Sequence, residues 1–357
     1  MTLIIAEAGV NHNGDEALAF ALVDAAYKAG ADIVKFQTFK TNNLVTKAAP
    51  QADYQIKNSK TVETQLSMLS RLELSFDVHH KLIRYCNKLG IEFLSTAFDM
   101  ESLSFLINDL ALTRLKIPSG ELTNSPLVLA YAKSGCDLIL STGMATLAEI
   151  ESALGVIAFG YTATGNTEPS IEAFQLAYYS KQGQLALQSK VTILHCTTEY
   201  PAPMEDINLK AMDTLRTAFN LPAGYSDHSQ GITIPVAAVA RGACIIEKHF
   251  TLDNNMEGPD HKASLEPNEL TEMITAIRNI EVALGDGVKA PRPSEIKNKL
   301  AARKSLVAAK DINIGEPFTH KSVDIKRPGN GLDPSQYWSL LGKKASKEYK
   351  GGDLILE

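Results

Sequence analysis

Several features are scarce in this sequence, and each absence excludes a class of protein. The chain has only four cysteines in 357 residues and no CxxC spacing, so neither a disulfide framework nor a zinc cluster is indicated. Cys196 and Cys244 fall inside apolar runs, and we expect buried free thiols. A net charge of -6 argues against a general nucleic-acid or anionic-membrane binder. No apolar run approaches the roughly 20 residues of a membrane span, and no signal peptide precedes Leu3, so we expect a cytoplasmic protein without membrane partners.

A glycine-rich phosphate loop is also missing after the first predicted strand, where residues 7–14 read EAGVNHNG. What the chain does contain is eight short apolar runs that alternate with segments of helical periodicity. These predicted strands are 3–8, 33–36, 93–97, 114–117, 138–141, 191–196, 224–226 and 244–249. The alternation predicts an α/β fold, a (β/α)8 TIM barrel over residues 1–285. A doubly wound sheet is the alternative, but it would usually carry the missing loop.

The length of the chain and the prolines near residue 290 predict a second, smaller domain. Residues 286–304, with Pro291 and Pro293, are expected to be a linker, and residues 305–357 form short β-like pieces that predict a small β-rich domain. Two segments inside the barrel are longer than ordinary loops. Residues 38–71 and 160–190 are therefore expected to be lids or binding loops. The second is polar and rich in Gln and Ser, and we expect part of it to be an extra helix or a variable insert.

Two histidines follow predicted strands near the end of the barrel region. His228 and His249 are about twenty residues apart, the length of one βα unit. If their strands are neighbours, both imidazoles project from the same rim and can share a divalent cation that keeps open positions for substrate. The alternative is a pair of unrelated core histidines. Of the others, His12 either orients Glu7 or caps its loop, and we expect His79, His80 and His320 to be solvated.

Basic and hydroxyl side chains also follow predicted strands. Lys35 and Lys116 stand at two strand ends, and serines and threonines stand at several others. Cations neutralise a phosphate while hydroxyls and backbone N–H groups fix its oxygens, so this set predicts a phosphate cradle. A single such lysine is commonly a surface residue whose apolar stem covers the protein.

Nine motifs in order resemble the signatures of the sialic acid synthase family over nearly the whole chain. They are AEAGVNHNG (6–14), VKFQT (34–38), KIPSGE (116–121), LSTGM (140–144), HCTTEYP (195–201), YSDH (225–228), EKHFT (247–251), GPDH (258–261) and KRPGNG (326–331). The resemblance implies a catalytic barrel joined to a C-terminal antifreeze-like (SAF) domain. It also implies condensation of phosphoenolpyruvate with an N-acylated mannosamine-type sugar, which releases phosphate.

The same resemblance implies roles for individual residues. His228 and His249 would bind the metal ion, which is expected to be Mn2+, with Mg2+ or Co2+ as alternatives. The phosphoenolpyruvate site would consist of Lys35, Thr96, Lys116, Ser119, Ser141 and Ser226. The sugar site would consist of Gln37, Tyr200, Asp260 and Arg327, with Glu7 and Glu121 as the acid and base. Arg327 would come from the second subunit of a domain-swapped homodimer.

The sugar is left open by these motifs. Our first reading is N-acetylneuraminate synthase, and the alternative is N,N'-diacetyllegionaminate synthase acting on a 2,4-diacetamido-2,4,6-trideoxymannose. A pseudaminate synthase is less favoured, because the first motif reads EAGVNH rather than an ELSANH type. From other classes, a non-catalytic sugar-binding protein and a pyruvate aldolase remain as alternatives. Lysines and histidines at strand ends are costly if they are buried unpaired, and a protein without catalysis does not need them. Release of phosphate, which occurs only with phosphoenolpyruvate, would distinguish the synthase from a pyruvate aldolase.

Overall fold

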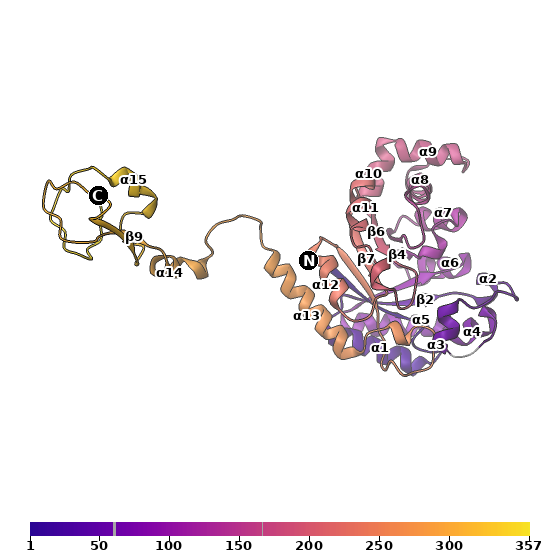
Figure 1. Ribbon diagram of the computed structural model, residues 1–357. Coiled ribbons are helices and arrows are strands. Elements are labelled where there is room, and N and C mark those ends of the chain that lie inside the picture. Colours follow the sequence, from indigo (N-terminus) through magenta and orange to yellow (C-terminus); the bar gives the residue numbers. More distant parts are fainter. Residues whose placement is uncertain (60–61, 166) are drawn as a thin grey trace. The chain divides into compact units, whose positions relative to one another are not determined.

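The chain divides into two compact units, Met1–Gly285 and Asp286–Glu357, in a computed structural model that describes residues 1–59, 62–165 and 167–357 (Figure 1). Eight strands of the first unit form one parallel sheet. They are β1 (Leu3–Gly9), β2 (Ile33–Thr38), β3 (Glu92–Ala97), β4 (Arg114–Ile117), β5 (Asp137–Ser141), β6 (Val191–Cys196), β7 (Ala223–Asp227) and β8 (Ile245–His249).

The order of these strands shows a closed sheet. They pair in the order β3-β2-β1-β8-β7-β6-β5-β4, so the first strand lies between the second and the last, and β3 and β4 pack against each other. The predicted (β/α)8 barrel is confirmed, and the doubly wound alternative is wrong. Every predicted strand is present, with bounds that differ by at most a few residues.

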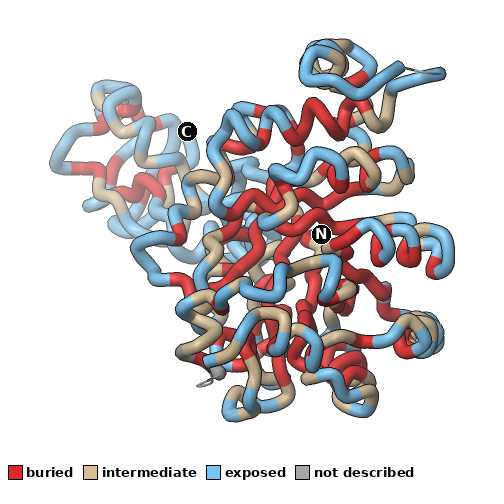
Figure 2. The backbone as a smooth tube through the Cα atoms, turned by 90° about the vertical axis from the view of Figure 1, so that its right-hand side faces the viewer, coloured by how far each residue is buried: buried red, intermediate tan, exposed pale blue. Residues whose placement is uncertain are grey.

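Helices cover the outside of the strands (Figures 1 and 2). They are α1 (Glu16–Ala29), α5 (Phe76–Leu89), α6 (Met100–Asn108), α7 (Ser125–Lys133), α8 (Leu147–Thr162), α11 (Ala211–Phe219), α12 (Thr233–Ala240) and α13 (Pro267–Leu284). Local chemistry sets their ends. The first helix begins where the Asp15 side chain accepts from the Leu18 N–H, and it ends at Gly30, whose φ of 84° suits glycine.

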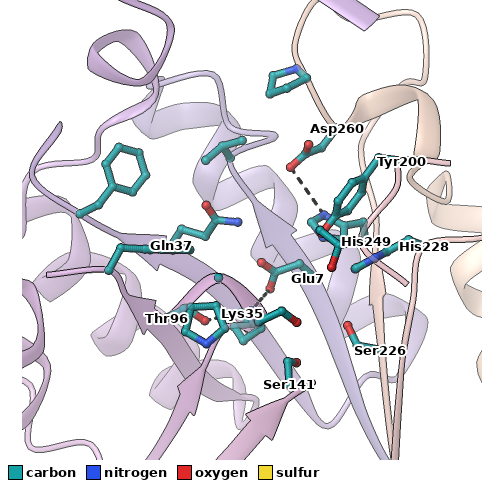
Figure 3. Close-up of a pocket in the computed structure, with 18 of the residues that line it drawn as sticks. Glu7, Lys35, Gln37, Thr96, Ser141, Tyr200, Ser226, His228, His249 and Asp260 are labelled. Carbon is teal, nitrogen blue, oxygen red and sulfur yellow. Dashed lines mark hydrogen bonds and ion pairs between the residues drawn. The ribbon is translucent and has the colours of Figure 1, made fainter. Parts of the chain in front are cut away.

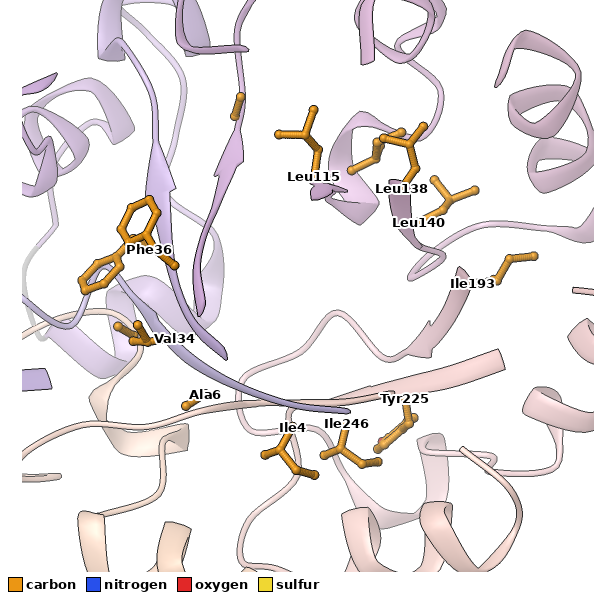
Figure 4. Close-up of a cluster of buried hydrophobic side chains, with 14 of the residues drawn as sticks. Ile4, Ala6, Val34, Phe36, Leu115, Leu138, Leu140, Ile193, Tyr225 and Ile246 are labelled. Carbon is orange, nitrogen blue, oxygen red and sulfur yellow. The ribbon is translucent and has the colours of Figure 1, made fainter. Parts of the chain in front are cut away.

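The strands bury two apolar layers because successive side chains point to opposite faces. Outward-facing residues such as Ile4, Val34 and Ile246 pack under the helices (Figure 4). A smaller cluster fills the inside of the barrel, and its buried members are Ile5, Ile33, Leu94, Ile139, Leu194 and Ile245. Burial of one such side chain contributes roughly 1.5–3 kcal/mol. Two residues further along most of these strands, the inward-facing positions turn polar.

The two long segments of the barrel are largely helical. The first holds α2 (Thr41–Leu44), α3 (Asp53–Ser59) and α4 (Gln65–Leu72), and the second holds α9 (Ile171–Tyr179) and α10 (Lys181–Lys190). Short 3-10 turns η1 (Ser119–Glu121), η2 (Met204–Asp206) and η3 (His261–Ala263) follow strands β4, β6 and β8. In the described part of the chain, no helix has the length and apolar character needed to cross a bilayer.

The C-terminal unit is small and contains an antiparallel pair of strands. It consists of α14 (Pro293–Ala302), β9 (Ser305–Ala308), β10 (Val323–Lys326), η4 (Pro334–Gln336) and α15 (Tyr337–Leu340). Its own core includes Leu306, Phe318 and Tyr349. The stretch expected as a linker thus holds a helix, α14, in its second half. All four cysteines are free, as predicted; Cys196 is buried as expected, whereas Cys244 is only half-buried.

Candidate active site

A cavity of about 240 Å³ opens at the carboxyl ends of the barrel strands. All eight strands contribute a lining side chain to it, either from within the strand or from the residue next to its end. In Figure 3, His228, His249, Tyr200 and Asp260 gather on one side, opposite Gln37 and Thr96. Twelve of the predicted site residues line this cavity. They are Glu7, Lys35, Gln37, Thr96, Lys116, Ser119, Ser141, Tyr200, Ser226, His228, His249 and Asp260.

Four buried charged side chains form what we call the charged floor of the cavity: Glu7, Lys35, Lys116 and Glu247. Lys35 Nζ lies 2.7 Å from Glu7 Oε2 and 3.5 Å from Glu247 Oε2, and Lys116 Nζ lies 2.9 Å from Glu247 Oε1. All four are at most 7% exposed. Burial of four charges is tolerable because two ammonium groups and two carboxylates face each other.

The two carboxylates of the charged floor differ in acidity. Burial raises the pKa of Glu7 above its usual range, against the lowering effect of Lys35, and the nearby Glu247 carboxylate adds to the rise. Burial also acts to raise the pKa of Glu247, but Lys116 and Lys35 outweigh it and hold that pKa well below its usual range. Two carboxyl groups whose pKa values are driven apart can act as one acid and one base.

Hydroxyl and N–H groups surround the lysines. Thr96 Oγ1 accepts from Lys35 Nζ at 3.1 Å, and Ser226 Oγ donates to Glu247 at 2.8 Å. The buried Ser141 hydroxyl has no hydrogen-bond partner in the described residues. Gly143 N donates to Ser119 Oγ at 2.9 Å, a close approach that only glycine permits, since a Cβ there would lie 2.3 Å from Thr198 Oγ1. These donors suit the oxygens of a phosphate or carboxylate.

The two predicted metal ligands lie side by side at the carboxyl ends of neighbouring strands, His228 directly after β7 and His249 as the last residue of β8. The rings of His228 and His249 have centroids 5.6 Å apart. His228 Nδ1 lies 2.6 Å from the Thr197 carbonyl, which fixes Nδ1 as the donor and leaves a lone pair on Nε2. Burial lowers the pKa of His228 to about 4 and that of His249 well below its usual value, so both rings are neutral.

This chemistry fits a divalent cation with open positions. His249 Nδ1 is buried without a hydrogen-bond partner, and Asp260 Oδ2 lies 3.8 Å from it. Neutral imidazole nitrogens and a carboxylate oxygen are ligands that Mn2+ and related ions accept. No group of three or more His, Cys, Asp or Glu side chains forms a ready ligand set in the described part of the chain. The remaining positions of an ion here would be open to substrate and water.

A second surface of the cavity is apolar. We call it the apolar wall; its members are Phe39, Leu44, Met68, Leu69 and Leu72, and all come from the first long segment. Three of them, Phe39, Met68 and Leu72, pack with Val10 in one buried cluster. The expectation that residues 38–71 are a binding loop agrees with this placement.

Two predicted site residues lie elsewhere. Glu121 is not among the residues that line the cavity, and its carboxylate accepts from Asn124 Nδ2 at 2.7 Å within the same turn. Arg327 belongs to the C-terminal unit, where it is exposed and its Nε donates to the Ala302 carbonyl at 3.0 Å. Neither position tests the predicted role, and both roles stay predictions.

The expectations for two further histidines, His12 and His79, had different outcomes. His12 is buried, and its Nδ1 accepts from Gly14 N at 2.9 Å, so it caps its loop. The expectation of a solvated His79 was wrong. This ring is fully buried and bonds Thr38 Oγ1 at 2.8 Å, because it lies on the inner face of α5.

Glu247 is the residue that the sequence reasoning missed. It lies at the centre of the charged floor, bonded to Lys116 and Ser226 and close to Lys35. The signal was present in the strand itself. Residues two apart in a strand share a face, so a predicted inward-facing His249 implies an inward-facing Glu247.

Comparison with known proteins relates the whole chain to one family. Residues 22–289 match the model of the NeuB family, and residues 303–357 match the SAF domain. The chain is 51% identical to the N,N'-diacetyllegionaminic acid synthase of Campylobacter jejuni, over 100% of this chain and 99% of that protein. It is 44% identical to the protein of the same name from Legionella pneumophila, over 99% and 93%. These relatives favour our alternative reading over N-acetylneuraminate synthase.

A solved structure agrees with the relatives. The N-acetylneuraminic acid synthetase of Leptospira borgpetersenii, in complex with citrate, is 33% identical, with a TM-score of 0.67 over 83% of this chain and 90% of that one. The resemblance read from the motifs, the small SAF domain and the prediction of an enzyme are all confirmed. This chain belongs to the NeuB family and is a synthase of the sialic acid type.

Proposed function

We propose that this enzyme condenses phosphoenolpyruvate with 2,4-diacetamido-2,4,6-trideoxymannose to give N,N'-diacetyllegionaminate and phosphate. The observation that carries the proposal is one cavity with two unlike surfaces, the charged floor and the apolar wall. The first suits a small, multiply charged substrate, and the second suits a sugar with few hydroxyls. The 51% identical Campylobacter jejuni synthase supports the same sugar.

Phosphoenolpyruvate would bind over the charged floor. Its phosphate and carboxylate carry the charges that Lys35 and Lys116 can neutralise, and the free Ser141 hydroxyl can donate to one of its oxygens. In the absence of substrate the two lysines are paired with Glu7 and Glu247. An incoming anion competes for these lysines, which favours protonation of Glu7, the carboxyl group whose pKa is already raised.

The protonated Glu7 can then act as the acid of the condensation step. When C3 of phosphoenolpyruvate attacks the sugar aldehyde, the carbonyl oxygen becomes a hydroxyl and needs one proton, which Glu7 supplies. Water adds to C2 of the resulting cation, and Glu247, whose basicity rises when the bound anion draws Lys116 away from it, accepts one of the water protons. The C2–O bond to phosphate then breaks while the new C2 hydroxyl becomes the ketone, and the proton of that hydroxyl leaves with the phosphate. A divalent ion held by His228 and His249 would supply Lewis acidity at the aldehyde.

The apolar wall supports the choice of sugar. A methyl group at C6 and the methyl of a second acetamido group bury favourably against Met68, Leu69 and Leu72, whereas the C6 hydroxyl of N-acetylmannosamine would lose water there without a partner. Tyr54 and Tyr200, whose ring centroids lie 5.0 Å apart, add flat surfaces on which acetamido groups can lie.

A phosphate-release assay with phosphoenolpyruvate and Mn2+ tests this proposal. The 2,4-diacetamido sugar should give a kcat/KM on the order of 10-fold to 200-fold above that of N-acetylmannosamine, the range expected for small groups in an apolar pocket. A preference for N-acetylmannosamine would restore our first reading. Absence of phosphate release with both sugars would exclude the reaction class.

We also propose a homodimer in which Arg327 of one subunit serves the sugar site of the other. Arg327 is exposed, and the C-terminal unit that carries it is compact on its own. A guanidinium fork suits an acetamido oxygen. Arg327→Ala and Glu7→Gln enzymes should each be inactive, yet regain part of the activity when mixed and allowed to exchange subunits. If demonstrated exchange restores nothing, Arg327 does not act across subunits.

A further inference from the structure

A buried ion pair lies behind the two histidines, outside the cavity. Lys248 Nζ is 2.6 Å from Asp227 Oδ2, and both side chains are 0% exposed. The two residues are register partners on β7 and β8. Their side chains face away from the cavity, because the residues on both sides of each line it and side chains alternate along a strand.

Ser229 completes a closed set of bonds with this pair. Its N–H donates to Asp227 Oδ1 at 3.0 Å, its hydroxyl donates to Asp227 Oδ2 at 3.0 Å, and its carbonyl accepts from Lys248 Nζ. We call Asp227, Ser229 and Lys248 the strand clamp. It holds the chain immediately before and after His228 and immediately before His249.

Stability alone does not account for the strand clamp. Transfer of two charges from water to a protein interior costs several kcal/mol per ion, and well-packed apolar substitutes are often as stable as a buried pair. The position of the strand clamp, next to both histidines in the sequence, indicates a role in the metal site. Groups that fix the orientation of a metal ligand influence metal affinity, and the clamp joins the residues that flank His228 to the residue that precedes His249.

The two histidines differ in how they are held. His228 is fixed through its own ring, since Nδ1 bonds the Thr197 carbonyl at 2.6 Å. His249 Nδ1 has no hydrogen-bond partner in the described residues, and its ring is held by packing against Tyr200 and His228. The position of its backbone, which Lys248 anchors to β7 and to the turn after it, therefore matters more than for His228.

We propose that Asp227, Ser229 and Lys248 are positioning residues that hold His228 and His249 at the spacing required to share one divalent cation. This inference rests on the metal site of the proposed function. It predicts that loss of the clamp weakens metal binding more than it weakens the fold.

The test compares Mn2+ affinity, measured by titration calorimetry, in three purified full-length proteins. They are the wild type, the charge-balanced variant Asp227→Asn/Lys248→Met, and the matched control Asp32→Asn/Arg278→Met. The control removes another ion pair of the barrel, with N···O 2.8 Å, that precedes β2 at the opposite end of the strands. We expect the clamp variant to bind Mn2+ about 10-fold to 100-fold more weakly, with an altered EPR spectrum of the bound ion. The control should bind as the wild type does.

Each outcome decides the inference. Unchanged Mn2+ affinity in a folded clamp variant would overturn it, as would an equal loss in the control. If the double variant does not fold, Ser229→Ala, which removes one bond to Asp227, replaces it. A smaller loss of Mn2+ affinity is then expected, and no loss contradicts the proposal. A wild type without affinity for Mn2+ would instead remove the metal site of the proposed function and this inference with it.

Discussion

The charged floor and the apolar wall enclose the same cavity but come from different parts of the fold. The floor consists of strand residues whose spacing follows from the closed sheet: Glu7 lies opposite Lys35, and Glu247 lies opposite Ser226, which bonds to it. The wall comes from a segment between β2 and α5 that the barrel itself does not require. We propose from this difference that the charged floor performs the chemistry and the apolar wall selects the sugar.

The histidine pair should give the largest effect, because it serves the reaction with any sugar. Chelation of divalent ions, or His228→Ala or His249→Ala, should abolish phosphate release with both sugars, and added Mn2+ should restore only the chelated wild type. Thermal unfolding serves as the control for folding. Full turnover in the presence of chelator would contradict a metal site at His228 and His249.

Glu7→Gln should give the next largest effect, because the amide cannot supply a proton. We expect kcat to fall about 10²-fold to 10⁴-fold with both sugars alike. Glu172→Gln, at an exposed position of α9, is the matched control, and its kcat should stay within about twofold of the wild type. Glu121→Gln tests the role predicted for Glu121, and because that residue does not line the cavity, the loss should be smaller than for Glu7→Gln. A loss of kcat from Glu121→Gln as large as that from Glu7→Gln would support the predicted role of Glu121 as the base and would contradict the use of Glu247 in its place.

Lys116→Ala should act on binding more than on chemistry. The KM for phosphoenolpyruvate should rise by a factor that corresponds to roughly 1.5–3 kcal/mol, the contribution of a charge-assisted hydrogen bond. The KM for the sugar should change little, because the apolar wall is intact. A change confined to the sugar KM would contradict the division between the two surfaces.

Met68→Gln should give the smallest effect and the most selective one. It keeps the length of the side chain but places an amide in the apolar wall. The ratio of kcat/KM values between the 2,4-diacetamido sugar and N-acetylmannosamine should fall by about 10-fold, while the phosphoenolpyruvate KM stays constant. Met100→Gln, at an exposed position, is the control. Equal losses with both sugars would show that the wall only supports the fold.

The same comparison shows what the sequence can predict. The strands are short apolar runs between turn signals, so their positions could be read directly, and the residues at their ends could be assigned to one rim. Glu247 could have been found by the alternation that places His249 inward. The direction of the Glu121 side chain could not be read from the strand pattern, because this residue lies in the turn η1, where alternation no longer applies.

The apolar wall could not be predicted from the sequence in this way. Phe39, Leu44 and Met68 belong to separate pieces of the segment, directly after β2, in the short α2 and in α4, and only tertiary contacts bring them to one surface. His79 illustrates the same limit. Its position in an amphipathic helix permits either exposure or burial, and the hydroxyl of Thr38 that makes burial favourable belongs to a neighbouring strand.

The most direct test of the division between floor and wall is a crystal structure with Mn2+, phosphoenolpyruvate and the unreactive alcohol of the 2,4-diacetamido sugar. The account predicts that phosphate oxygens lie within hydrogen-bond distance of Lys35 and Lys116, and that the C6 methyl group contacts Met68, Leu69 or Leu72. A sugar bound with C6 in solvent and its acetamido groups away from the apolar wall would contradict it.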